Sequence, residues 1–439
     1  MSRDLPRTIG FWGGSGIMVG VIIGSGIFRT PTSIAQQMGN PWVILLLWVF
    51  GGMLALFGAL TYAELGTMFP RSGGIYVFLH QGFGPIVAFV FGWTYMLISK
   101  PLAASGIAVV FAEHVNTLLG TKWDPRILTC VMIIVLTAVN ACGTRLGAGF
   151  AIFLTSLKAG ALALIIVLGL SLAKGSAANF EPIESPRPFW LALAPVLAAI
   201  MWTYDGWSDV GAVAGEVREP QRLLPRIFLI GTAATIVLYV AVNAVYIALV
   251  PLGEMRNERT VAPLVMQRLL GDASGQLVTI LIIISTLGAT HSSILTGARV
   301  TFAQSRDGLL FSFLGHIHPT YQTPAVALWF QAALSCLAIC VLEHFERLAG
   351  GFVFTMWIFY ALAAVSVIVL RIRRPDLPRP YRCWGYPVVP IVFVLSAAFM
   401  TFLQIRESPA ENLTWLAILV AGAPCYFLWC RLRISGPRP

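Results

Sequence analysis

The chain has 439 residues, of which 57% are hydrophobic and only 11% are charged. A soluble globular protein carries about 25% charged residues, so the composition excludes that class and indicates an integral membrane protein. The formal net charge of +10 does not indicate nucleic-acid binding, because the basic residues lie at the ends of apolar runs and form no single tract. The seven cysteines and six histidines show neither a disulfide framework nor metal-ligand spacing, so we expect no metal and no cofactor.

Twelve apolar segments are long enough to cross a bilayer, which requires about 20 mostly apolar residues. In chain order they cover residues 9–30, 41–67, 84–117, 125–142, 147–173, 189–214, 226–251, 273–303, 324–342, 347–371, 386–405 and 412–431. No connecting loop is long enough to hold a soluble domain. With twelve spans, most lysines and arginines outside the spans fall on the side of the N-terminus, which predicts that both termini are cytoplasmic.

The first span contains the stretch "GVIIGSGIF", Gly20–Phe28. The glycines at three- and four-residue spacing up to Gly20 form a small-residue stripe that lets another helix approach closely. That role does not explain Gly24-Ser25-Gly26, where two glycines flank a serine and weaken the helix by roughly 1 kcal/mol each. Unwound backbone at membrane depth is tolerated only where it is buried or lines a cavity. We therefore predict an interruption here.

The sixth span carries a matching interruption, Thr203-Tyr204-Asp205-Gly206-Trp207, in the middle of an apolar helix. Interrupted helices at corresponding positions of two five-span halves indicate an inverted-repeat transporter with a site at the midplane. We therefore predict an all-α membrane protein with a five-plus-five inverted repeat. Residues 1–175 form the first repeat, residues 185–375 form the second, and residues 380–439 add two spans and a tail.

A broken helix can bind a zwitterion with its backbone alone. The break leaves unpaired amide N–H groups at the start of the second half and unpaired carbonyls at the end of the first. The amide end carries roughly half a positive charge and the carbonyl end roughly half a negative charge. An α-amino acid presents a carboxylate and an ammonium at matching separation, and glycine leaves the amides open to close approach.

Several stretches resemble signature motifs of the amino acid–polyamine–organocation superfamily along the length of the chain. They include "GVIIGSGIF", "TYAELGTMFPRSGGIYVFL" from Thr61 to Leu79 and "YDGWSDVGAVAGEVREPQRLLPR" from Tyr204 to Arg226. The stretch "LISKPLAASGIAVVFAEHV" in the third span, with its Lys100-Pro101 pair, is similar to the L-type amino acid transporters and their bacterial relatives.

The resemblance implies alternating access and the transport of α-amino acids, often by sodium-independent exchange. It places the substrate carboxylate on the amides around Ser25, Gly26 and Ile27. It places the ammonium on carbonyls near Ile22, Trp202 and Asp205, with Trp202 or Tyr204 closing over the substrate. The full predicted substrate-binding set is Ile22, Ile23, Gly24, Ser25, Gly26, Ile27, Trp202, Thr203, Tyr204, Asp205 and Gly206. Small residues from Ser285 to Thr290 in the eighth span favour neutral substrates.

Charges within spans are costly, so each one is a candidate for function. Lys158 lies about thirteen residues into the fifth span from Arg145, roughly 20 Å along a helix, too deep to reach the surface easily. The resemblance implies that its ammonium replaces a sodium ion and bridges the first span to the eighth. Alternatively, Lys158 carries a proton for a coupled importer of amino acids or polyamines.

The other charges have more ordinary expected roles. We expect Asp205 to cap the second half-helix, with binding of a cationic substrate side chain as the alternative. Glu64 lies near Arg71 in the sequence, so an ion pair between them at the inner gate and a purely structural role are both open. Lys100 is expected to be held by carbonyls that the Pro101 kink frees. Glu113 and Asp209 are expected to be solvated near the ends of their spans.

The loop after the third span reads "HVNTLLGTKWDPR", His114–Arg126, without cysteine. Mammalian L-type transporters carry a cysteine there that links them to a glycoprotein. We therefore expect no disulfide-linked partner, which fits a chain that works alone in a prokaryotic inner membrane. A membrane-embedded enzyme would require clustered acids or histidines near one face, and a channel would require polar stripes without paired breaks. Neither pattern is present, so both remain remote alternatives.

Overall fold

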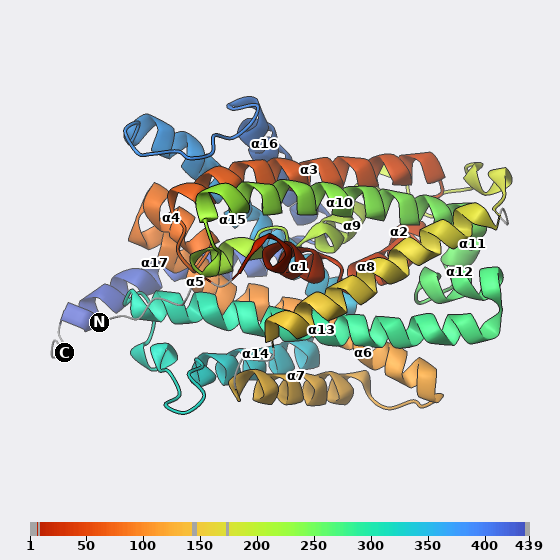
Figure 1. Ribbon diagram of the computed structural model, residues 1–439, viewed down its shortest axis with the longest axis horizontal. Helices are drawn as coiled ribbons and strands as arrows, with labels where there is room; N and C mark the ends of the chain where they lie inside the picture. The colour runs from red at the N-terminus through yellow and green to blue at the C-terminus, as the bar shows by residue number, and fades with distance from the viewer. Residues whose placement is uncertain (1–6, 8, 143–146, 173–174, 435–439) are drawn as a thin grey trace.

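The computed structural model describes residues 7, 9–142, 147–172 and 175–434, and these residues form helices joined by short loops, with no strand among them. The prediction of an all-α protein is therefore confirmed. Figure 1 shows the helices lying largely along one direction. Ten of the described helical segments are long and apolar enough to cross a membrane, and two further predicted spans correspond to the shorter helix of residues 125–141 and to the described part of the helix that ends at Ser171.

The helices of the first half, in chain order, are α1 (Phe11–Ile22), α2 (Gly26–Ala35), α3 (Pro41–Met68), α4 (Ile75–Phe83), α5 (Pro85–Thr94), the π-helix η1 (Tyr95–Ser99), α6 (Lys100–Leu119), α7 (Pro125–Ala141), α8 (Gly147–Ser171) and the 3₁₀ turn η2 (Ala177–Phe180).

Those of the second half are α9 (Phe189–Tyr204), the 3₁₀ helix η3 (Asp209–Glu216), α10 (Pro220–Leu249), α11 (Leu252–Met255), α12 (Val261–Leu270), α13 (Asp272–Arg306), the 3₁₀ turn η4 (Ser312–Gly315), α14 (Ala325–Leu342), α15 (Phe345–Arg373), α16 (Val388–Glu407) and α17 (Pro409–Ile434).

Both predicted interruptions are present. The first span stops at Ile22 and resumes at Gly26, so that α1 and α2 are two half-helices of one crossing. The sixth span stops at Tyr204, and its second half is the 3₁₀ helix η3, which is more tightly wound than the α-helix expected there. The Ile9 N–H donates to the Glu216 carbonyl at 2.9 Å, so the start of α1 lies beside the end of η3.

The half-helices lie at the centre of the molecule. In Figure 1, α3 and α10 run side by side along one edge, α7 and α14 lie along the opposite edge, and α1 is between them. α1 packs against α8 and α10, and α2 packs against α9. The two interrupted spans are therefore enclosed by uninterrupted helices, which keep lipid away from the backbone groups that the breaks expose.

The short connecting helices gather at the two ends of the molecule. α11 and α12 lie at the right-hand end of the view, whereas α4 and the end of α17 lie at the left-hand end (Figure 1). This separation matches spans that run from one end to the other, with the connections outside the apolar layer.

Candidate functional site

The first break exposes backbone groups at the centre of the protein. The Gly24 N–H donates back to the Ile22 carbonyl at 2.7 Å, and the chain then turns into α2. Three consecutive amides at the start of α2 have no acceptor among the described residues: Ser25, Gly26 and Ile27. The Ser25 hydroxyl is also buried without a hydrogen-bond partner in this part of the chain. The start of α2 therefore presents four unused polar groups, all of which can donate a hydrogen bond.

The second break depends on one glycine conformation. Asp205 is extended, and Gly206 follows with φ at 111°, a region that residues with a side chain rarely adopt. The backbone then turns into η3 at Asp209. A glycine is therefore required at this position if the span is to be interrupted here.

The two breaks lie against each other. A Cβ atom added to Gly206 would lie 2.9 Å from the Ile22 nitrogen, and one added to Gly26 would lie 2.8 Å from the Thr203 Cα atom. Both distances are shorter than van der Waals contact. The glycines thus allow the first break to touch the second, and each break forms part of the surroundings of the other.

A cavity lies where the breaks meet. Val21, Ile22, Gly24, Ser25 and Gly26 line it from the first span, and Trp202, Asp205 and Asp209 line it from the sixth. Its remaining walls come from Lys100, Ala103 and Ile107 on α6, Ser293 on α13 and Phe352 on α15. A second cavity shares Lys100, Asp205, Asp209 and Phe352 with it and continues past Tyr95, Ser208 and Tyr360.

The structure brings the predicted site residues to the two breaks but gives them different positions. Those that line the cavity are Ile22, Gly24, Ser25, Gly26, Trp202 and Asp205. Those that lie at the breaks without lining it are Ile23, Ile27, Thr203, Tyr204 and Gly206. These outer residues position the backbone instead. The Thr203 hydroxyl, for example, lies 2.8 Å from the Thr30 hydroxyl on α2 and connects the two broken spans.

Aromatic rings form one wall of the cavity. Trp202 meets Phe345 edge-on at 5.5 Å between ring centroids and meets Phe352 edge-on at 5.3 Å. Tyr204 turns away and packs against Trp48 and Tyr239 at 5.7 and 5.2 Å. Of the two aromatic residues expected to close over the site, Trp202 is therefore the one in position to do so.

Asp205 does not act as the simple helix cap that we expected. It is the C-cap residue of α9, and its Oδ1 atom accepts a hydrogen bond from the Tyr360 hydroxyl at 2.5 Å. The residue before η3 is Ser208, whose side chain makes no capping hydrogen bond. Asp205 therefore links the second break to α15, a contact between helices that lie far apart in sequence.

Lys100 and Asp209 form a buried ion pair that the sequence did not predict. The Lys100 ammonium lies 3.4 Å from Asp209 Oδ2, 3.5 Å from the Thr296 hydroxyl and 5.5 Å from the centroid of the Tyr95 ring. The expectations that Lys100 binds carbonyls freed by Pro101 and that Asp209 is solvated are therefore wrong. The reason is that the π-helical turn η1 precedes Lys100 and accommodates the proline, while the ammonium points across to η3.

Lys158 lies against the first span. Its ammonium is buried and donates to the Gly20 carbonyl at 3.4 Å. The contact from α13 to the same break comes instead from Ser285, whose hydroxyl lies 3.5 Å from the Ile23 carbonyl. Lys158 on α8 thus contacts the last turn of α1, and Ser285 on α13 contacts the first unwound residue, Ile23.

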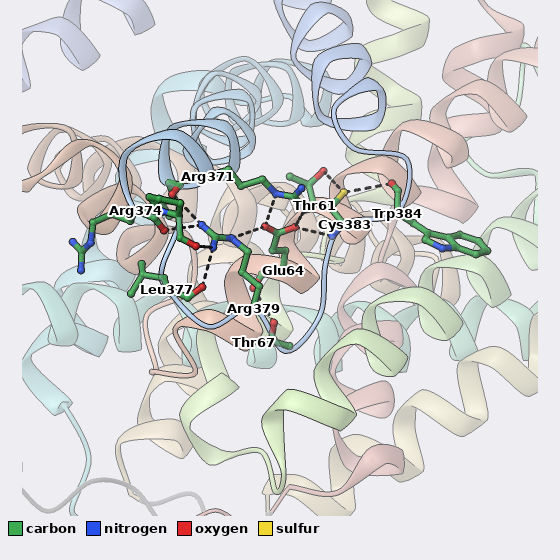
Figure 2. A network of polar contacts seen from close by, with 11 residues as sticks. Thr61, Glu64, Thr67, Arg371, Arg374, Leu377, Arg379, Cys383 and Trp384 are labelled. Atoms are coloured by element: carbon green, nitrogen blue, oxygen red, sulfur yellow. Dashed lines mark hydrogen bonds and ion pairs between the residues drawn. The ribbon is translucent and has the colours of Figure 1, made fainter.

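Glu64 does not pair with Arg71. Figure 2 shows its carboxylate surrounded by groups from α15 and the loop that follows, with Arg371 Nη2 at 2.6 Å and the Cys383 N–H at 2.7 Å. Arg379 Nε lies 3.6 Å from the same carboxylate. The alternative of a Glu64–Arg71 ion pair is wrong, because the packing of α3 against α15 sets the partner of Glu64, and proximity in sequence does not.

Glu113 is not merely solvated either. Its carboxylate lies 3.6 Å from the Arg29 guanidinium on α2, and Glu346 on α15 lies 3.1 Å from the same guanidinium. The Arg29 guanidinium is also 5.9 Å from the centroid of the Phe345 ring, which packs on Trp202. Three helices, α2, α6 and α15, therefore meet at Arg29, next to the ring that packs on Trp202.

Sequence reasoning missed the cavity residues that come from uninterrupted helices. Ser293 and Phe352 carry no signal that separates them from other helix-packing residues. Lys100 and Asp209 did carry a sequence signal. Two opposite charges within spans are costly unless they pair, which indicates an ion pair between them. Within the described ranges, no three histidine, cysteine or acidic side chains gather in a way that could hold a metal ion.

Comparisons with known proteins agree with this architecture. The family model described as "Amino acid permease" matches residues 9–424. The chain is 32% identical to the mouse (Mus musculus) "b(0,+)-type amino acid transporter 1" over 451 residues, which cover 99% of this chain and 92% of that protein. It is 31% identical to the human (Homo sapiens) "Cystine/glutamate transporter" over 97% of this chain and 86% of that protein.

A third relative is the mouse "Large neutral amino acids transporter small subunit 2", 32% identical over 97% of this chain and 81% of that protein. These relatives are transporters, and the family match covers nearly every span. The prediction that the protein is not an enzyme is confirmed. From its interrupted helices, its central cavity and these similarities, the chain belongs to the amino acid permease family and is an amino acid transporter of the amino acid–polyamine–organocation superfamily.

Proposed function

We propose that the protein exchanges neutral α-amino acids across the cell (inner) membrane by alternating access, without sodium. The observation that carries this proposal is the cavity that both broken helices line. Its free amides at the start of α2 and its carbonyls at the ends of α1 and α9 match the two charged groups that every α-amino acid carries. Its other walls combine the apolar or small residues Ala103, Ile107, Ser293 and Phe352 with the paired charges of Lys100 and Asp209, which suits a neutral side chain.

The substrate carboxylate binds the amides of Ser25, Gly26 and Ile27, together with the Ser25 hydroxyl. These donors support the assignment because they are unused and lie at the positive end of α2. The ammonium binds carbonyls near Ile22, Trp202 and Asp205. The Trp202 carbonyl accepts one hydrogen bond, from the Asp205 N–H, and has a second lone pair available, whereas the Ile22 carbonyl already accepts from the Gly24 N–H and the Tyr239 hydroxyl. Trp202 covers the bound substrate from the aromatic wall.

Lys158 replaces a sodium ion at the first break. Its buried ammonium on the Gly20 carbonyl supports this role, because a fixed positive charge there offsets the negative end of α1. A protein with such a fixed charge does not need a sodium ion to hold the break in shape. If Lys158 instead loses and regains a proton during transport, the protein is a proton-coupled importer, and the experiment below separates the two.

The proposed function includes a membrane topology. Residues 1–175 and 185–375 form two inverted repeats, residues 380–439 complete the chain, and both termini are cytoplasmic. The chain functions without a disulfide-linked partner, because the loop His114–Arg126 contains no cysteine. One relative is described as a small subunit. This chain is expected to differ from that relative in the loop without cysteine.

The test uses purified protein in sodium-free proteoliposomes and a radiolabelled mixture of neutral amino acids. The vesicles are either empty or preloaded with the same unlabelled amino acids. Uptake only into preloaded vesicles is the expected result. Uptake into empty vesicles driven by an imposed pH gradient would show that the protein is a proton-coupled importer and not an exchanger. Absence of uptake under both conditions would overturn the neutral amino acid assignment.

Lys158→Ala is expected to abolish sodium-independent exchange, because the break loses both its attachment to α8 and its compensating charge. Ser156→Ala is the matched control, since Ser156 is exposed on the same helix. The measurement is the initial rate of exchange in preloaded vesicles, normalised to the amount of protein incorporated. Exchange at the rate of the unmodified protein in the Lys158 variant would refute the role of this residue.

A further inference from the structure

The cavity contains three charged side chains, Lys100, Asp205 and Asp209, and each one has a different environment. Lys100 and Asp209 satisfy each other at 3.4 Å, with the Thr296 hydroxyl and the Tyr95 ring beside the ammonium. Asp205 accepts a hydrogen bond from the neutral Tyr360 hydroxyl. Among the described residues, Asp205 is therefore the charged cavity side chain that makes no direct ion pair.

This arrangement matches the charges of a zwitterion. The substrate ammonium lies at the end of α9 beside Asp205 and balances that carboxylate. The substrate carboxylate lies at the positive end of α2. Lys100 and Asp209 are left over, and they cancel each other. A substrate with a neutral side chain therefore brings no further charge into the cavity that would compete for Lys100 or Asp209.

We propose that the Lys100–Asp209 ion pair sets the side-chain specificity of this cavity by rejecting both acidic and basic side chains. The inference rests on the proposed function, and it adds the residues that decide which amino acids are accepted. An acidic side chain would have to compete with Asp209 for the ammonium, and a basic side chain would have to compete with Lys100 for the carboxylate. Either one would leave a buried charge of the original pair without its partner, which is costly.

The position of the pair supports this role over a purely structural one. Both residues line the cavity, so their charges face the space that a substrate occupies. The pair also bounds the second cavity that continues past Tyr95 and Ser208, away from the free amides of α2. A side chain that points away from the substrate carboxylate would meet the pair first. Lys100 and Asp209 are thus specificity-determining residues.

Removing one partner of the ion pair should increase uptake of amino acids whose side-chain charge is opposite to that of the remaining partner. Asp209→Asn frees the Lys100 ammonium, so uptake of glutamate relative to glutamine should rise about tenfold, the effect of one gained charge-assisted hydrogen bond. Lys100→Met frees the Asp209 carboxylate, so uptake of lysine relative to glutamine should rise to a similar extent. The double variant carries neither charge and should again prefer glutamine.

The controls make the same chemical changes outside the cavity. Glu219→Gln removes an exposed carboxylate, and Lys122→Met removes an exposed ammonium, and neither should alter the ratios. The unmodified protein is measured with the same panel, and it should exchange glutamine while glutamate and lysine compete poorly. Glutamate or lysine competing as well as glutamine in the unmodified protein would overturn the proposal without any variant.

The outcomes separate this inference from the proposed function. If the unmodified protein exchanges neutral amino acids but the two single variants keep its ratios, the ion pair does not set specificity, and the proposed function stands. If the unmodified protein exchanges no neutral amino acid, the proposed function itself fails. A single variant that does not fold leaves the decision to the other variant and to the competition panel.

Discussion

At the scale of single residues, the site is defined by positions where a side chain is absent or left without a partner. Gly26 and Gly206 allow two broken helices to touch, since a Cβ atom on either would overlap the other span. Among the described residues, the buried Ser25 hydroxyl has no hydrogen-bond partner, and it lies beside free amides. Burying such groups costs free energy unless they are hydrogen-bonded. The protein therefore carries a destabilised centre that a bound substrate can stabilise.

Gly26→Ala is expected to abolish transport, because its methyl group would lie 2.8 Å from the Thr203 Cα atom and push the two breaks apart. Gly160→Ala is the control, since a Cβ atom at that position on α8 would meet nothing within 4 Å. The control should keep full activity and gain stability, as alanine is favoured over glycine in a helix by about 1 kcal/mol. Exchange rates and unfolding temperatures of both variants check this, and an active Gly26 variant would contradict the close approach.

At the scale of elements, buried charges connect helices that the chain order keeps apart. Glu64 attaches α3 to the end of α15 and to the loop before α16 (Figure 2). The Arg371 guanidinium also lies 3.7 Å from the centroid of the Tyr386 ring in that loop. Arg29 attaches α2 to α6 and α15. Each cluster thus sets the position of a helix that lines the cavity or packs against one that does.

Glu64→Gln should destabilise the protein by about 3 kcal/mol, because Arg371 and Arg379 lose the negative charge that compensates them. The measurement is the unfolding temperature of the purified protein in detergent. Glu219→Gln is the matched control, as its ion pair with Arg222 is solvent-exposed and should contribute little. Equal unfolding temperatures for the two variants would show that the Glu64 cluster does not hold α3 to α15.

Arg29→Gln should loosen α2, because the guanidinium no longer bridges Glu113 and Glu346. Hydrogen–deuterium exchange of peptides that cover residues 28–35 should become faster, while exchange in α3 should stay unchanged. Arg126→Gln removes an exposed arginine that also pairs with two acids, so it serves as the control. Unchanged exchange in α2 would show that helix packing, and not the Arg29 cluster, holds this half-helix.

At the scale of the whole molecule, uninterrupted helices surround two interrupted ones. α3 and α10 lie on one side of α1, and α7 and α14 lie on the other (Figure 1). The broken spans bring unpaired backbone groups to the centre, and the intact spans exclude lipid from them. A motion that changes access to the cavity therefore has to move whole helices relative to one another, since a packed interior does not deform continuously.

The chain is expected to transport without a disulfide-linked partner. Its mobility on a denaturing gel should be the same with and without reductant after thiols are blocked in the intact membrane. The purified chain alone should catalyse exchange in proteoliposomes. A larger species that reductant removes, or activity that requires a second purified chain, would contradict this prediction.

Much of the fold and part of the site could be predicted from the sequence. The spans follow from long apolar runs, and the breaks follow from glycines and polar residues where an apolar helix is expected. The partners of the buried charges could not be predicted. Lys100 and Asp209 are 109 residues apart, and Glu64 and Arg371 are 307 residues apart. The sequence suggested Arg71 for Glu64 only because it is near in the chain.

The membrane class, the two interrupted spans and the backbone chemistry that they expose follow from the amino-acid sequence alone, since these depend on local hydrophobicity and on the conformations that glycine permits. Three contacts depend instead on how the helices pack: Trp202 and not Tyr204 faces the cavity, Tyr360 meets Asp205, and Lys100 pairs with Asp209. These contacts join helices that are distant in sequence. The physical reason is that a buried polar group takes whichever partner helix packing brings within reach, and packing is a property of the whole chain.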